Sequence, residues 1–103
     1  MIVISEPVEF EWDKGNLNKN NRKHRVQDKE AEEVFSDNDR FIFTDKLHSE
    51  NEERFRIIGK TQRGRILFIV FTIRHDRIRI ISARDINKKE VFLYEKKTRT
   101  AKV

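Results

Sequence analysis

Arginines recur along the second half of the chain at spacings that could bring several guanidinium groups together. Arg54 and Arg56 are two residues apart in a strand-like run, so they share one face of that strand. Arg74 and Arg84 end two further strand-like runs, and we expect these ends to converge in space. Grouped guanidiniums bind phosphate bidentately and can stabilise the extra negative charge of a phosphorane transition state. The alternative is that these arginines only form ion pairs with nearby carboxylates, namely Glu50, Glu52, Glu53 and Asp85.

Histidine is the other residue type here that could do chemistry near neutral pH. His24 follows two basic residues at the expected end of a helix, where its imidazole could transfer a proton or cap the helix C-terminus. His48 and His75 fall in expected loops, and we interpret both as solvent-exposed. The histidines lack the spacing of zinc ligands and the chain has no cysteine, so we expect no metal site.

Other catalytic patterns are missing from the sequence. It has no glycine-rich phosphate loop, no recognisable Ser/His/Asp order and no credible pair of catalytic carboxylates. An enzyme with this sequence would act mainly through positioning and positive charge. That chemistry suits RNA cleavage in which the substrate's own 2′-hydroxyl is the nucleophile, and we expect no cofactor.

Four strands are expected to carry the arginines. Alternating and continuous apolar runs predict a β-meander over residues 41–45, 53–60, 65–74 and 77–84. Residues 66–71 are continuously apolar, so this stretch should be a central strand with both faces covered. The alternation of Val8, Phe10 and Trp12 with acidic residues predicts one more short strand before the meander.

Three helices are expected to accompany these strands. The first spans about residues 14–24, with Asp13 as its cap, and the second follows Asp28 as its cap. The third spans about residues 88–97. Together the elements predict an α+β fold, a mainly antiparallel twisted sheet with helices packed on it.

Composition indicates a small, basic protein. The chain has 103 residues, of which 36% are apolar and 40% charged, so nearly every large apolar side chain must be buried. We expect one domain over residues 1–103, with its core in 8–97 and a frayed tail in 98–103. The net charge of +5 favours a polyanionic partner such as nucleic acid. Without cysteine, a targeting segment or a membrane-spanning run, the sequence predicts a cytoplasmic protein with no membrane partner.

Ordered blocks over about residues 8–97 resemble the BrnT family. The blocks are FEWD (10–13), Asn20, KH (23–24) with Val26, AEEVF (31–35), EERF (52–55), IG (58–59), FTIR (71–74), IRIISAR (78–84) and KKE (88–90). Each block is short, but their order and separations are consistent. The chain departs from the family pattern at Arg25 and His75, where family members usually carry glycine.

This resemblance implies a fold similar to that of RelE-like ribonucleases. It also implies the toxin of a bacterial type II toxin–antitoxin pair, an endoribonuclease that cleaves RNA and inhibits translation. The implied partner is a BrnA-type antitoxin with a ribbon-helix-helix region, through which the complex would contact operator DNA and repress its own operon.

The resemblance also suggests roles for the matching residues. Arg74 and Arg84 would bind and stabilise the scissile phosphate. Lys23 and His24 would bind the RNA backbone, with possible proton transfer, and Glu53 would orient the neighbouring arginine or serve as an alternative base. The further RNA-binding candidates are Arg22, Arg54, Arg56 and Arg79.

A hypothesis from another class stays open beside this one. The chain could be a non-catalytic regulatory subunit whose basic face only binds an antitoxin or DNA partner in autoregulation. The two hypotheses differ in their outcome with RNA, because the second predicts binding without cleavage.

Overall fold

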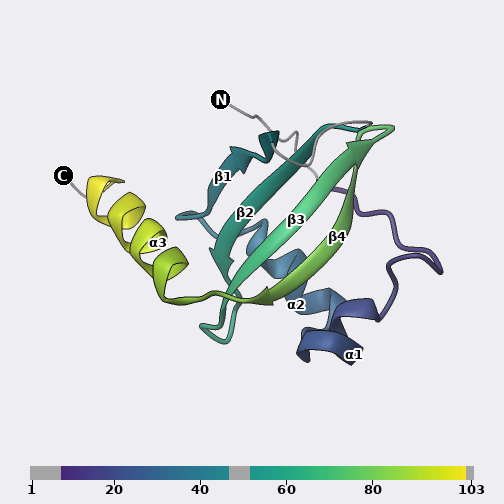
Figure 1. Ribbon diagram of the computed structural model, residues 1–103, viewed down its shortest axis with the longest axis horizontal. Helices are drawn as coiled ribbons and strands as arrows, with labels where there is room; N and C mark the ends of the chain where they lie inside the picture. Colours follow the sequence, from purple (N-terminus) through teal and green to yellow (C-terminus); the bar gives the residue numbers. More distant parts are fainter. Residues whose placement is uncertain (1–7, 47–51, 102–103) are drawn as a thin grey trace.

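The fold is built on a four-stranded antiparallel sheet. The computed structural model describes residues 8–46 and 52–101, with side chains as far as Glu95. The strands lie in chain order across the sheet (Figure 1), and they are β1 (Phe41–Thr44), β2 (Arg54–Lys60), β3 (Ile66–Arg74) and β4 (Arg77–Asp85). The predicted meander is therefore confirmed, and each observed strand end lies within one residue of its predicted position.

Helices cover one face of the sheet and leave much of the other open. α2 (Asp28–Val34) lies behind the sheet in Figure 1, and the main core lies between it and β2, β3 and β4, whereas α1 (Lys19–His24) lies beside β4. α3 (Lys88–Ala101) belongs to the opposite side, where Tyr94 packs near Phe68. We call the surface under α2 the helix face and the opposite surface the open face. The predicted α+β class is confirmed.

The central strand is covered on both faces where the sequence is continuously apolar. Leu67 and Ile69 of β3 belong to the core on the helix face, whereas Phe68 belongs to a smaller cluster on the open face. On the helix face, α2 approaches the sheet closely at Gly59 of β2. A Cβ atom at Gly59 would lie 2.7 Å from Cγ1 of Val34, so a larger residue there would push α2 away.

A β-bulge in β4 decides which of its side chains share a face. Val70 of β3 pairs with Ser82 and Phe71 pairs with Ile80, so Ile81 is an additional residue without a partner in the ladder. Because side chains alternate along a strand, Arg79 and Arg84 would otherwise point to opposite faces. The bulge places both arginines on the open face.

The predicted strand at residues 8–12 is wrong. This segment makes a single isolated parallel bridge between Phe10 and Ile78, at the beginning of β4. The backbone of Ile78 donates to the Glu9 carbonyl and accepts from the Glu11 N–H, both at 2.8 Å. The pairing stops there because the chain then turns at Asp13.

The predicted helix over residues 14–24 is too long, and Asp13 does not cap it. The carboxylate of Asp13 instead accepts a hydrogen bond from the Gly15 N–H at 2.8 Å, which closes a turn. Asn18 then adopts a left-handed backbone with φ 58°, so α1 begins only at Lys19. Side chains that hydrogen-bond their own backbone favour turns over helix here.

The two departures from the family pattern both fall at left-handed backbone positions. Arg25 follows α1 with φ 56°, and His75 opens the turn between β3 and β4 with φ 51°. Glycine adopts this conformation without the steric conflict that a Cβ atom introduces. The chain therefore keeps the geometry that glycine favours while using larger residues.

α3 begins where predicted and continues further than predicted. At its start, the Glu90 N–H donates to Oδ1 of Asn87 and the Asn87 N–H donates to the Glu90 carboxylate, at 3.0 and 2.9 Å. The helix ends at Ala101, beyond the predicted end near residue 97. None of the helices in the described ranges is long and apolar enough to cross a membrane.

Candidate functional site

Six arginines share the open face of the sheet. Partners in register lie on the same face, and the pairs Arg56 with Val70, Arg84 with Phe68 and Arg79 with Thr72 all fall on this side. The open face is the side of the sheet away from α2 in Figure 1. Its arginines are Arg54, Arg56, Arg74, Arg77, Arg79 and Arg84.

The expected convergence of Arg74 and Arg84 is wrong. Because β3 and β4 are antiparallel, their C-terminal ends lie at opposite ends of the sheet. Arg74 pairs with Arg77 at one end, and Arg84 pairs with Phe68 at the other. Phe68 and Arg74 are six positions apart along β3, a distance of about 20 Å at the usual rise of a strand. One phosphate cannot contact both side chains.

Arg84 belongs to a compact group at the end of β4. Its guanidinium lies over the ring of Phe68, 4.4 Å from the ring centre, and its Nη1 and Nη2 donate to the two carboxylate oxygens of Glu90 at 2.8 and 2.7 Å. Arg56 lies over the same ring at 5.5 Å and forms an ion pair with Asp45 at 3.1 Å. The Phe68 ring thus makes cation–π contacts with both Arg56 and Arg84.

The Glu90 carboxylate is held in its charged form. Burial raises the pKa of Glu90, but the Arg84 guanidinium and the Asn87 N–H outweigh burial and leave that pKa below its ordinary value. A charged Glu90 orients Arg84 without occupying all of its donors. Within the described residues, Glu90 and the Asp85 carbonyl use only Nη1 and Nη2 of Arg84. Nε–H and a second Nη2 hydrogen remain on one edge, the geometry that binds phosphate bidentately.

Arg74 lies in the second group, at the opposite end of the open face. Its Nε and Nη2 donate to the Glu52 carboxylate, with Nη2 at 3.0 Å, and this hydrogen bonding lowers the pKa of Glu52. Arg79 donates to Asp13 at 2.8 Å and to Glu11 at 3.1 Å. Each of these guanidiniums is paired with carboxylates, as the alternative interpretation of the arginines expected. Among the carboxylates named there, Glu52 binds Arg74, whereas Glu11, Asp13 and Glu90 were not foreseen.

The basic residues of α1 lie beside the Arg84 end of β4. The buried side chain of Asn20 accepts a hydrogen bond from the Ala83 N–H at 2.9 Å, which fixes α1 against β4. Arg22, Lys23 and His24 occupy the last turn of α1 and are exposed. Their positive charge suits the carbonyl end of a helix. This group therefore lies at the Arg84 end of the sheet, beside the edge of β4 and far from Arg74, whereas the Arg84 side chain itself lies on the open face.

Arg65 was not predicted as a site residue, yet it links α1 to β4. Its Nη1 and Nη2 donate to the carbonyls of Arg25 and His24 at 2.8 and 3.2 Å. The same guanidinium binds both carboxylate oxygens of Asp85, at 2.6 and 3.0 Å, and lowers the pKa of Asp85. No local motif marks such a residue, because its partners are distant in sequence. Arg65 fixes the end of α1, where His24 lies, next to the end of β4.

Glu53 lies apart from the Arg84 group. It is exposed and precedes β2 at the Arg74 end, where its carbonyl accepts a hydrogen bond from the Thr72 hydroxyl at 2.8 Å. The structure therefore does not bring Glu53 together with His24 and Arg84. His75 is exposed, as predicted, whereas His48 and Glu50 lie outside the described residues.

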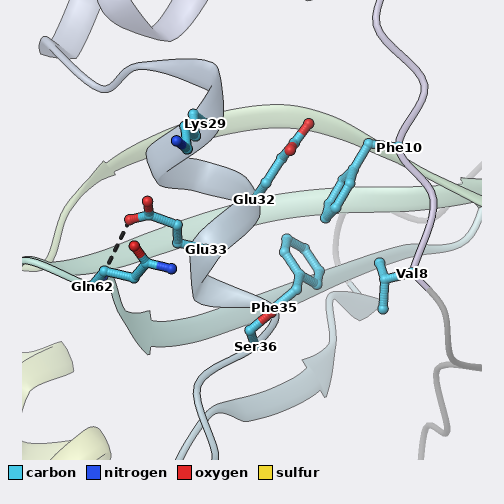
Figure 2. A pocket seen from close by; sticks show the side chains of 8 residues that line it. All are labelled: Val8, Phe10, Lys29, Glu32, Glu33, Phe35, Ser36 and Gln62. Carbon is cyan, nitrogen blue, oxygen red and sulfur yellow. Dashed lines mark hydrogen bonds between the residues drawn. The ribbon is translucent and has the colours of Figure 1, made fainter.

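A hollow on the other side of the molecule contains none of the predicted site residues. It lies between α2 and the segment near Phe10, and Figure 2 shows the rings of Phe10 and Phe35 on one side of it. Glu33 and Gln62 close another side, where the backbone N–H of Gln62 donates to the Glu33 carboxylate at 3.1 Å, drawn as a dashed line in Figure 2. The candidate chemistry thus lies on the open face and not in this hollow.

Fold and site together define a basic α+β protein with an arginine-rich sheet face suited to phosphate groups. A family model described as "Ribonuclease toxin, BrnT, of type II toxin-antitoxin system" matches residues 12–90. The chain belongs to this family of ribonuclease toxins. Membership implies an RNA substrate and an antitoxin partner. No curated protein matches the chain.

Proposed function

We propose that this chain cleaves RNA on the open face of its sheet without a metal ion. In this reaction the 2′-hydroxyl attacks the adjacent phosphorus, the 5′-oxygen leaves, and a 2′,3′-cyclic phosphate forms. The observation that carries the proposal is the braced guanidinium of Arg84, whose free edge can bind two phosphate oxygens. Guanidinium charge placed where negative charge develops lowers the barrier of phosphoryl transfer.

The proposed roles follow the two ends of the face. Arg84 binds the scissile phosphate, and the Arg56 guanidinium lies beside that of Arg84, over the same Phe68 ring. α1 lies beside the edge of β4 at its Arg84 end, so Lys23 binds the RNA backbone and His24 transfers a proton where the RNA passes over that edge. Arg54, Arg74 and Arg79, at the other end of the open face, bind RNA nucleotides further from the cleavage position. Arg22 extends the positive surface over α1.

We further propose that a BrnA-type antitoxin with a ribbon-helix-helix region neutralises this toxin. The complex would bind operator DNA through the antitoxin and would act in the cytoplasm. The proposal includes a RelE-like fold and a single domain. Support comes from the family match and from the antiparallel sheet with its helices.

Arg84→Ala tests the site directly. The purified variant should cleave RNA at least tenfold more slowly than the parent, because one oriented donor group typically contributes a factor of about 10² to 10³. Arg63→Ala is the matched control, since Arg63 is an exposed arginine of the β2–β3 loop outside the site, and it should cleave normally. Gel analysis of labelled RNA in excess chelator measures rate and metal independence together.

The outcomes separate the competing hypotheses. Unchanged cleavage by Arg84→Ala would show that the scissile phosphate binds elsewhere. Loss of cleavage by the parent in chelator would contradict the metal-independent mechanism. RNA that is bound but stays intact with the parent would favour the non-catalytic regulatory subunit.

A further inference from the structure

The Arg56 guanidinium contacts two aromatic rings in addition to its carboxylate partner. It lies over two phenyl rings, 5.5 Å from the centre of Phe68 and 5.9 Å from the centre of Phe43. Its Nε forms the ion pair with Asp45, whose side chain is buried. The planar guanidinium of Arg56 is thereby held over two aromatic rings, while 29% of the side chain stays exposed.

This arrangement continues as a row across the sheet. Phe43 pairs with Arg56, Arg56 with Val70, and Val70 with Ser82, so one residue from each strand lies on the same line of the open face. All four side chains are half-buried, neither enclosed by the core nor fully extended into water. The row runs beside Arg84, which is next to Ser82 along the open face of β4.

From this geometry we propose that Arg56 and Phe43 form a stacking subsite for an unpaired nucleobase, next to the phosphate that Arg84 binds. The inference rests on the proposed ribonuclease function and specifies its substrate as single-stranded RNA. A base would stack on the outer plane of the Arg56 guanidinium and extend toward Phe43. Open sheets with aromatic and arginine side chains bind single strands in this way.

Stacking accounts for the subsite better than added charge does. Asp45 and Glu90 already neutralise Arg56 and Arg84, so this end of the face gains little from long-range attraction to phosphate. The flat guanidinium surface and the half-buried ring stay available for a planar, apolar-faced ligand. In a duplex the base faces are covered by their neighbours, so paired RNA could not use this subsite.

Arg56→Lys tests the inference, because lysine keeps the charge that pairs with Asp45 but has no planar surface. The probe is a short single-stranded RNA in which every ribose carries a 2′-O-methyl group, so that it cannot be cleaved. Arg56→Lys should weaken its binding about tenfold, the effect of losing one stacked base, with the same salt dependence as the parent. Phe43→Leu should weaken binding several-fold, and the control Arg63→Lys should bind like the parent.

Two further probes complete the test. A duplex of the same sequence should bind more weakly than the single strand and should not distinguish Arg56→Lys from the parent. An abasic version of the single strand should also bind both proteins equally. Equal binding of the base-containing single strand by Arg56→Lys and the parent, or a parent that prefers the duplex, would overturn the inference.

The failure of the inference can be told apart from the failure of the proposed function. Because the 2′-O-methyl strand cannot react, its binding does not depend on catalysis. A parent protein that binds this strand through Arg56 but leaves natural RNA intact would contradict only the nuclease proposal. A parent that cleaves natural RNA while Arg56→Lys binds and cleaves equally well would contradict only the stacking subsite.

Discussion

At the scale of single residues, the candidate site depends on side chains that hold other side chains. Arg84 is oriented by the Glu90 carboxylate on one edge and by the Phe68 ring below. A guanidinium group that is already fixed when the substrate binds is more effective in catalysis, because no conformational entropy is lost in ordering it. The carboxylates near the arginines therefore do more than neutralise charge, since each one also restricts where its arginine can point.

The contact between α1 and β4 gives a prediction at this scale. Asn20→Ala leaves the buried Ala83 N–H without its acceptor, and we expect the free energy of unfolding to fall by about 1 to 3 kcal/mol. Denaturant unfolding measures the difference. Asn21→Ala is the control, because Asn21 is an exposed neighbour on the same helix and its substitution should change stability by less than about 0.5 kcal/mol. Equal losses in both variants would contradict the anchoring role of Asn20.

At the scale of elements, the strands could be predicted closely from the sequence. Alternation and the apolar run at 66–71 reflect burial on one or two faces, and this is a local property that each strand carries in its own residues. The first helix was predicted poorly because the Asp13 turn and the left-handed Asn18 replace helical hydrogen bonds with local ones. Such competition depends on tertiary contacts that a pattern of residue types does not contain.

The site itself could be predicted only in part. Arg54, Arg56, Arg74 and Arg84 were identified by type and lie on one face, but their grouping follows from antiparallel pairing and from the bulge at Ile81. A register shift of one residue exchanges the two faces of a strand, and no local signal announces it. Glu90 and Phe68 were missed as site residues because their role arises only once the start of α3 and the Phe68 ring of β3 both contact Arg84 of β4.

The separation of the two arginine groups predicts how substitutions combine. Arg74→Ala and Arg84→Ala should have additive effects on RNA binding within about 0.5 kcal/mol, because the side chains are far apart and share no partner. Arg56→Ala and Arg84→Ala should be non-additive, since both guanidiniums lie over Phe68. Double-mutant cycles from binding titrations of uncleavable RNA measure both couplings. A stronger coupling for the distant pair than for the close pair would contradict the observed grouping.

At the scale of the whole molecule, the positive charge is distributed unevenly. The arginines occupy the open face and the basic end of α1, whereas α2 on the other side carries Asp28, Glu30, Glu32 and Glu33. Because carboxylates pair with Arg56, Arg74, Arg79 and Arg84, however, the positive potential at the open face is smaller than its number of arginines suggests. The sequence predicted the sign of this charge and its preference for a polyanion, but only the fold determines which surface carries it.

Paired carboxylates tie the stability of the whole molecule to pH. Hydrogen bonding by Arg79 lowers the pKa of Asp13, by Arg74 that of Glu52 and by Arg65 that of Asp85, from ordinary values of 3.8 for aspartate and 4.5 for glutamate. Because these groups bind protons more tightly in the unfolded chain, their contribution to stability is complete above the unfolded pKa. It is lost as the pH falls through the lower folded values.

We therefore expect the melting temperature to stay level from pH 7 to about pH 5 and to fall steeply below about pH 4.5. Thermal unfolding in a buffer series at constant ionic strength measures this profile. Glu52→Gln removes one of the titrating groups, so it should be less stable than the parent at neutral pH and lose less stability on acidification. A parent protein whose melting temperature stays level to pH 3, or rises on acidification, would mean that these ion pairs do not stabilise the fold.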